Sequence, residues 1–439
     1  MSECPRHIHP VYRPSGAGPI IVYAGDLLLS EDGVERVTTG DLELRLSPKP
    51  EFFAHVAGSE PWLIMSGLNP EKFTVALPPG ASIEPPTDSA LAAEPEEASS
   101  WADFTIPITR LAAGDVKLAE RLILHVSGPL TKLPLPVCHT DGGQQRQLSL
   151  VLPGWDLRLA AAGDPEAVEE FSFVVDAVPQ RRPLDEDSAR RLCRRVFVLL
   201  SLTAGQEIGV GPVVGLNAAG RVVWAEWFAP RFQPGRSPWR WCPKDLVNTA
   251  LPVLAAGFSS LADNLGLEAV VDRAVNHLLA ANGPGALDVR IPVACSGLEL
   301  LGWAVLQRHQ WLTQEVLGKP HFPASACACL LLQWAGIPVD LPAHLSALAA
   351  RRGGVGQPEW AGPEVVFNVR NNLVHPPKKL DDPEWPSNDE LFEAWQLATW
   401  CLELAIVRLL GYENQYASRL RRSIEPLPWR TKDTHTSGG

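Results

Sequence analysis

The sequence lacks an excess of basic residues. Its 38 lysines and arginines are outnumbered by 50 aspartates and glutamates, which gives a net charge of −12. Non-specific binding to nucleic acid depends on clustered cations that contact phosphates. The charge balance therefore excludes a protein that coats DNA or RNA with its whole surface, although it is compatible with a local basic groove.

The patterns of membrane and secreted proteins are also missing. No apolar run reaches the roughly 18 residues that a membrane-spanning helix needs. The opening residues, MSECPRHIHPVYRPSG, contain no apolar core of the signal-peptide type. The longest apolar stretch, residues 326–337, is short enough to be a buried helix. We therefore expect a cytoplasmic protein with no membrane partner.

Motifs for metals, cofactors and phosphate loops are absent too. The eight cysteines are scattered without a Cys-x-x-Cys pair, so we expect reduced, buried thiols. His7 and His9 have no acidic or cysteine neighbour and indicate a flexible tail. Residues 209–215 are rich in glycine but lack the Gly-Lys-Ser/Thr ending of a phosphate loop, so they predict a turn between strands. The sequence predicts no metal and no cofactor.

The first part of the chain is rich in short apolar segments. Between residues 19 and 180, several segments such as DLELRLS alternate apolar and polar residues, and Gly, Pro and Asp separate them. Many short strands at this spacing predict a β-sandwich or an open barrel. Residues 80–100 are rich in Pro, Ala, Ser and Glu and indicate a mobile loop.

The pattern becomes helical after this region. Residues 184–205 predict a helix that Asp185 or Asp187 caps, and residues 207–228 predict a hairpin. We expect further helices near residues 244–265, 266–282, 291–317, 322–336, 340–352, 361–375 and 388–410. The last is the clearest, because apolar residues recur at spacings of three and four along one stripe: Leu391, Trp395, Ala398, Leu402, Ala405 and Leu409. Asn388 or Asp389 would cap its start and Gly411 its end.

These patterns predict an α+β protein in which the two kinds of structure are segregated. An N-terminal β-rich domain, a sandwich or an open barrel, precedes a C-terminal all-helical bundle. The expected boundaries are residues 1–180 for the β-rich domain, 181–243 for a helix, a hairpin and a Pro/Trp-rich linker, 244–430 for the helical domain and 431–439 for a disordered tail.

One stretch, FNVRNNLVHPPKK at residues 367–379, places polar groups at the end of a predicted helix. Pro376 disfavours helical geometry at His375, so the helix should stop there. Asn371 and His375 are four residues apart and share a face, and the long side chain of Arg370 can reach the same face. Histidine side chains transfer protons near neutral pH, and arginine binds phosphate through two donors.

Two interpretations of this stretch stay open. Histidine and asparagine in a last helical turn commonly stabilise the helix end, which is a purely structural role. Alternatively, the trio suits metal-independent RNA cleavage, in which a 2′-hydroxyl attacks the neighbouring phosphorus. That reaction needs a base, an acid and a cation. One arginine and one histidine supply half of this set, and two copies across a two-fold axis would supply all of it.

The stretch RNNLVHP resembles the Arg-polar-x3-His signature of HEPN domains, which are helical, commonly dimeric and often ribonucleases. The upstream segment ACSGLELLGWAVL, residues 294–306, is similar to the helix of this superfamily that carries an acidic residue facing the site. The downstream residues 399–420 and the ending EPLPW resemble the ApeA-like branch. The resemblance covers roughly residues 245–430 and implies a helical bundle that forms a homodimer.

The resemblance also implies roles for individual residues. Arg370 would stabilise the scissile phosphate, and His375 would act as general base or acid. Asn371 would orient His375 or the phosphate, Glu299 would hold Arg370, and Asn372 would support the site. Nearby cations could contact the RNA backbone or be solvated surface charges: Lys378, Lys379, Arg419, Arg421 and Arg422.

Two functions from different classes follow. The first is a metal-independent endoribonuclease that leaves 2′,3′-cyclic phosphate ends, in anti-phage defence or as a toxin, with a β-rich domain that senses a ligand or a phage-derived trigger. The second is a non-catalytic HEPN dimerisation scaffold whose β-rich domain binds a ligand, a protein or nucleic acid. A third, weaker interpretation is a HEPN domain modified on a tyrosine, although the nearest ones, Tyr412 and Tyr416, lie some forty residues away.

Overall fold

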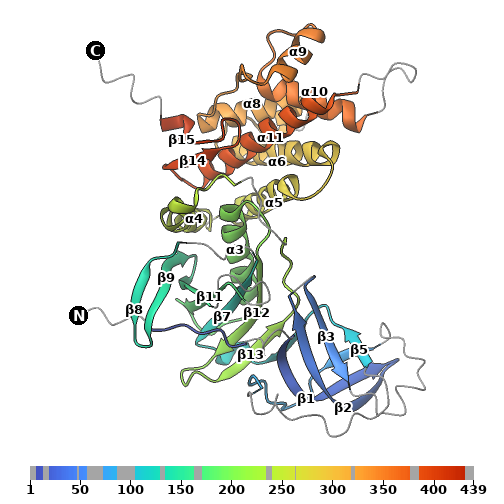
Figure 1. Ribbon diagram of the computed structural model, residues 1–439, viewed down its shortest axis with the longest axis vertical. Coiled ribbons are helices and arrows are strands. Elements are labelled where there is room, and N and C mark those ends of the chain that lie inside the picture. The colour runs from blue at the N-terminus through green and yellow to red at the C-terminus, as the bar shows by residue number, and fades with distance from the viewer. Residues whose placement is uncertain are drawn as a thin grey trace. The chain divides into compact units, whose positions relative to one another are not determined.

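A computed structural model describes most of the chain: residues 6–12, 19–46, 49–56, 73–86, 104–128, 134–162, 171–233, 240–262, 264–317, 322–375 and 385–430. The chain divides into two compact units (Figure 1). One holds residues 1–197 and 207–235, and the other holds residues 198–206 and 236–439. The predicted fold class, a β-rich N-terminal part followed by a helical C-terminal part, is confirmed. Most of the predicted loop at residues 80–100, and the predicted tail at 431–439, lie outside the described residues.

The first sheet of the β-rich unit has five antiparallel strands in the order β4-β1-β2-β3-β5. Asp32 and Gly33 join the two longest strands, and their φ angles of 50° and 82° are both positive. An Asp-Gly pair in this conformation forms the two-residue turn that matches the twist of a hairpin. The strands are β1 (Ile20–Glu31), β2 (Val34–Arg45), β3 (Glu51–Val56), β4 (Thr74–Ala76) and β5 (Phe104–Pro107).

The second sheet has eight strands in the order β6-β13-β12-β7-β11-β10-β9-β8. The predicted hairpin at residues 207–228 is present as β12 and β13, but it pairs into this sheet and is therefore part of the β-rich unit, not of a linker. The turn predicted at residues 209–215 was wrong, because these residues form strand β12. The strands are β6 (Leu111–Gly114), β7 (Arg121–Ser127), β8 (Val137–Thr140), β9 (Gly143–Leu152), β10 (Trp155–Ala161), β11 (Phe173–Pro179), β12 (Gly209–Leu216) and β13 (Val222–Trp227).

Both sheets contribute to one hydrophobic core. Leu27 and Leu42 come from the five-stranded sheet, and Val214 and Trp227 come from the eight-stranded sheet. Two sheets with their apolar faces in one core form a sandwich. Of the two predicted architectures for this unit, the sandwich is therefore the one that the structure has.

The N-terminal residues 6–12 are fixed against this unit. The backbone N–H of His7 donates to Asp141 at 2.6 Å. The side-chain amide of Gln145 accepts from the N–H of Ile8 at 2.9 Å and donates to its carbonyl at 2.6 Å. The prediction that this region forms a flexible tail was wrong, because the side chains that hold it lie far away in the sequence.

The second unit is mostly helical. Helix α3 (Glu186–Ala204) begins in the first unit, where Asp185 caps it by accepting from the N–H of Ser188, and its last residues belong to the second unit. The other helices are α4 (Val247–Leu261), α5 (Leu265–Asn282), α6 (Leu287–Arg308), α7 (Gln314–Leu317), α8 (Ala324–Ala335), α9 (Ser346–Gly354), α10 (Gly362–Val374) and α11 (Asn388–Leu409).

Two predictions for this unit need correction. The helix expected at residues 291–317 is split into α6 and α7 near Gln310, whose φ of 58° is incompatible with a helix. The unit is also not all-helical, because a short hairpin follows α11. Its strands are β14 (Gln415–Ser418) and β15 (Ser423–Pro426).

Helices α11 and α6 form the centre of the unit. Every residue of α11 from Ala394 to Val407 is buried, so the helix is surrounded by protein and not only covered along the predicted stripe. Its N-cap is Ser387, one residue before the predicted cap, in a capping box with Glu390. Helix α6 is long and apolar enough to span a membrane by length and composition alone. Its packing against α5, α8, α10 and α11 accounts for that composition as a core helix.

Candidate functional site

Helix α10 carries the Arg-polar-x3-His motif at its C-terminal end. Buried Val365, Val366 and Val369 fix the helix in the core of the helical unit. His375 follows the helix with φ −110° and ψ 147°, the extended conformation expected for the residue before a proline. The predicted stop of the helix at His375 is therefore confirmed.

The structure brings the motif residues to one exposed helix end. Asn371 and His375 are exposed and Arg370 is half-buried. The guanidinium of Arg370 donates through Nη1 to Oδ1 of Asn371 at 3.0 Å, and the N–H of His375 donates to the carbonyl of Asn371 at 3.0 Å. Among the described residues, none hydrogen-bonds with the imidazole of His375.

Arg370 extends from this end toward helix α6. Burial raises the pKa of the Cys295 thiol to about 12, while Arg370 lowers it and Glu299 raises it further. Both charged side chains therefore lie near Cys295. The Nε atom of Arg370 is buried and has no hydrogen-bond partner among the described residues. Within the described residues, Asn371 thus holds Nη1 of this guanidinium, while Nε makes no hydrogen bond.

The predicted support from Glu299 is only partly present. Glu299 lies on α6 near the motif but is exposed, and no ion pair joins it to Arg370 within the described part of the chain. Its carbonyl oxygen instead accepts from the Sγ of Cys327 at 3.8 Å. Asn372 is half-buried and does have interaction partners. Glu299 thus lies beside the motif, whereas Asn372 lies within it.

The predicted cations do not form one cluster. Lys378 and Lys379 lie outside the described residues. Arg421 and Arg422 are exposed on the turn between β14 and β15, and Arg421 forms an ion pair with Glu425 at 3.7 Å. These two arginines keep the accessibility that an RNA contact needs.

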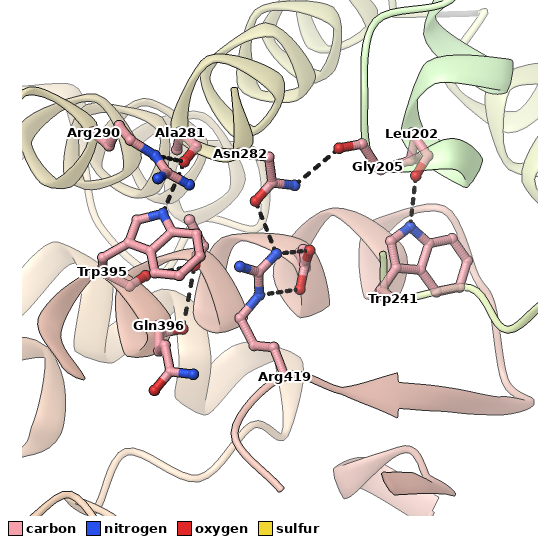
Figure 2. Close-up of polar contacts among 11 residues, drawn as sticks. Leu202, Gly205, Trp241, Ala281, Asn282, Arg290, Trp395, Gln396 and Arg419 are labelled. Atoms are coloured by element: carbon pink, nitrogen blue, oxygen red, sulfur yellow. Dashed lines mark hydrogen bonds and ion pairs between the residues drawn. The ribbon is translucent and has the colours of Figure 1, made fainter. Parts of the chain in front are cut away.

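Arg419 has a different environment from the one predicted. It is buried and forms an ion pair with the carboxylate of Glu403. It also donates to Oδ1 of Asn282 at 2.9 Å, and the amide of Asn282 donates to the carbonyl of Gly205 at 3.2 Å (Figure 2). The expectation that Arg419 belongs to an exposed basic cluster is corrected by this burial, and the residue instead links the hairpin to helices α11 and α5.

A set of hydrogen bonds that fixes α10 to its neighbouring helices could not be predicted from the sequence. Arg351 on α9 is largely buried, and it donates to Oδ1 of Asn368 on α10 at 2.9 Å and to Glu390 on α11 at 3.1 Å. Burial acts to raise the pKa of Glu390, but hydrogen bonds from Ser387 and Arg351 outweigh it and the pKa is lowered. The three residues are 17 and 39 positions apart along the chain, so no local spacing signals their contact.

The overall acidity of the chain does not reside in the helical region. Residues 236–439 contain 20 acidic and 18 basic side chains, so most of the net charge of −12 belongs to the rest of the chain. No group of three metal-binding side chains occurs within the described ranges. The cysteines in those ranges are free thiols, of which Cys242, Cys295, Cys327 and Cys401 are buried as predicted, whereas Cys138, Cys193 and Cys329 are half-buried. Tyr412 and Tyr416 are buried, which argues against their modification.

Two comparisons with known proteins give a match. The family model of the YopA C-terminal domain matches residues 265–427. The SPbeta prophage-derived uncharacterized protein YopA of Bacillus subtilis (strain 168) is 21% identical over 254 residues, which are 57% of this chain and 55% of the relative. The chain therefore spans about half the length of the curated relative that it matches. No solved structure matches.

The match to the family model and the motif concern the same region. Residues 265–427 lie within the part of the chain, roughly 245–430, that resembles HEPN domains. The matched family model carries the name YopA and not HEPN. The similarity to HEPN therefore depends on the residues of the motif and its flanking helices.

Proposed function

We propose that the chain is a metal-independent endoribonuclease of the HEPN type that acts as a cytoplasmic homodimer on RNA. The observation that supports this most is the exposed end of α10, where Arg370, Asn371 and His375 meet and the imidazole has no described partner. A general base or acid must be reachable by the substrate, and the exposed position of His375 meets that requirement. Neither ring nitrogen has a partner among the described residues.

The proposed reaction needs groups from two copies. His375 of one copy takes the proton of a 2′-hydroxyl, whose oxygen then attacks the adjacent phosphorus. The bond to the 5′-oxygen breaks, and a second acid, His375 of the other copy, protonates that leaving oxygen. Arg370 stabilises the negative charge on the pentavalent phosphorus. The products are a 2′,3′-cyclic phosphate and a 5′-hydroxyl.

Exposed apolar side chains beside the motif support a second copy. Val374 on α10, next to His375, is 43% exposed, and Trp303 on α6, one turn from Glu299, is 39% exposed. Contiguous exposed apolar patches mark interaction surfaces, and in this proposal the two side chains belong to one such patch. A symmetric contact over this face would cover them and bring two motifs together.

The proposed setting is conflict between phages and bacteria. The name of the B. subtilis relative describes it as prophage-derived, which fits a protein involved in anti-phage defence or a toxin. In this proposal the β-rich unit senses the ligand or phage-derived trigger that activates cleavage. The near-balanced charge of residues 236–439 is compatible with an RNA substrate at the helical unit.

Purified protein tests the nuclease directly. We expect it to cleave tRNA or mRNA in the presence of EDTA, and Arg370→Ala to lower the rate by roughly a hundredfold or more, as loss of one transition-state contact does. Arg308→Ala removes an exposed arginine from α6 and serves as the matched control. Unchanged cleavage by Arg370→Ala would contradict the assignment of this site.

A non-catalytic scaffold is the second candidate. The observation in its favour is that Glu299 makes no ion pair with Arg370 among the described residues, so the expected orienting contact is missing. Expression in a bacterial host together with the trigger, or with phage infection, separates the two functions. Toxicity of the wild type that Arg370→Ala abolishes supports the enzyme, whereas equal growth of both strains supports the scaffold.

A further inference from the structure

A buried carboxylate in the eight-stranded sheet holds two arginines. Asp176, in the middle of β11, is completely buried. Arg158, directly opposite on β10, donates from Nη2 to Oδ2 of Asp176 at 2.6 Å. Arg121, on β7 at the other side of β11, places Nη1 3.6 Å from the same oxygen. Because both guanidiniums approach one atom, the two cations are held close together despite their repulsion.

Most hydrogen-bond donors of the two arginines make no bond to the part of the protein that the structure describes. A guanidinium carries five N–H donors. Among the described residues, Arg158 makes only the hydrogen bond to Asp176, and Arg121 makes only the longer ion pair. The side chains of Arg158 and Arg121 are 29% and 22% exposed, so solvent reaches both. Asp176 fixes their positions and leaves donors available to a ligand.

A second carboxylate in the same sheet offers a comparison. Glu226 on β13 is buried as well, and it binds Arg190 at 3.1 Å and Arg110 at 3.4 Å. Arg190 also contacts Glu186 at 2.8 Å, so two carboxylates already neutralise these two guanidiniums. In the Asp176 cluster two guanidiniums face one carboxylate, which leaves a surplus positive charge.

We propose that Arg158 and Arg121 form a binding site for a phosphate group in the β-rich unit. Two close guanidiniums with free donors match the tetrahedral oxygens of a phosphate, which arginine binds through paired hydrogen bonds. The phosphate belongs either to a free phosphate or nucleotide or to the backbone of a nucleic acid, since the chemistry of recognition is the same. The site lies in the β-rich unit and does not depend on the proposed nuclease activity.

Thermal unfolding of the full chain tests this site. The probes are sodium phosphate, AMP and a single-stranded RNA oligonucleotide, each against sodium chloride at equal ionic strength, and the His375→Ala background prevents cleavage of the RNA. A ligand at concentration L that binds only the folded chain stabilises it by RT ln(1 + L/Kd), so Tm rises with the logarithm of the ligand concentration above Kd. We expect at least one probe to raise Tm, and Arg158→Lys to weaken its binding about tenfold because lysine lacks the paired donors.

Matched variants make the result decisive. Arg158→Lys and Arg121→Lys each keep a positive charge beside Asp176, so both are expected to fold. Arg110→Lys is the control, because it makes the same change at the neutralised Glu226 cluster. A response to phosphate or AMP assigns a free ligand, and a response to RNA alone assigns a nucleic-acid backbone. The proposal is overturned if no probe raises Tm, if both cluster variants bind like the wild type, or if Arg110→Lys loses binding equally.

Discussion

The buried ion pair between Arg419 and Glu403 gives the sharpest test of the helical unit. Each side chain is only 3% exposed, and Arg419 also donates to Asn282 (Figure 2). In Arg419→Ala the carboxylate of Glu403 would stay buried without its cation, and Asn282 would lose a donor. Breaking a buried pair from one side costs about 3–5 kcal/mol, so we expect the free energy of unfolding to fall by that amount.

The double variant Arg419→Met/Glu403→Leu separates the unpaired charge from lost packing. Replacing both partners with apolar side chains of similar size is often neutral, so we expect it to recover most of the lost stability, to within about 2 kcal/mol of the wild type. Urea unfolding followed by far-UV circular dichroism measures both variants, because the helical unit dominates that signal. The comparison uses the midpoint of the helical transition, since a chain with two units need not unfold in one step.

Two results would refute this reasoning. A loss below about 1 kcal/mol in Arg419→Ala would be typical of an exposed ion pair and would contradict the burial of this one. A loss of RNA binding without a loss of stability would restore the role that the sequence suggests for Arg419. Arg422→Ala is the control, because Arg422 is exposed on the same hairpin turn and its removal should leave stability unchanged.

Three further predictions concern separate parts of the chain. Burial lowers the pKa of His125 from 6.5 to about 4, so the unfolded chain binds more protons than the folded chain between these pH values. Acidification from pH 6.5 to pH 4 should therefore lower the free energy of unfolding by roughly 3 kcal/mol, and His125→Gln should reduce this pH dependence. In Gly257→Ala the new Cβ would lie 2.3 Å from the carbonyl oxygen of Leu410, so urea unfolding should show a free energy of unfolding lower by about 1–3 kcal/mol. In the control Gly354→Ala the new Cβ has no atom within 4 Å, and the change should be neutral or stabilising. A cross-linker that spans about 10 Å should join two copies of a His375→Cys variant, as two motifs facing across one phosphate require; a chain that stays monomeric would contradict the dimer.

Much of the fold could be predicted from local patterns. The alternating strands, the hairpin at residues 207–228 and the helix that Gly411 ends are all present, because each depends on periodicity and on turn residues close in sequence. The stop of α10 at His375 followed from Pro376 alone. Patterns among residues close in sequence were thus enough to predict these strands and helices and the exposed motif at the end of α10.

Contacts between distant residues could not be predicted. Arg419 seemed part of the exposed run SRLRRS, yet it is 16 residues from Glu403 and 137 residues from Asn282, and these contacts decide its burial. Residues 6–12 were predicted to be a flexible tail because Gln145, which hydrogen-bonds with Ile8, lies 137 residues away in the sequence. The expected contact between Glu299 and Arg370 needed a side-chain orientation that helix periodicity does not determine.

The chemistry of the RNA ends tests the central claim most directly. Wild-type protein, incubated with RNA in EDTA, should yield fragments with 2′,3′-cyclic phosphate and 5′-hydroxyl ends, identified by mass spectrometry. His375→Ala should yield none above background, while His344→Ala, which removes another exposed histidine of the helical unit, should match the wild type. Cyclic phosphate formation that persists in His375→Ala would contradict the account.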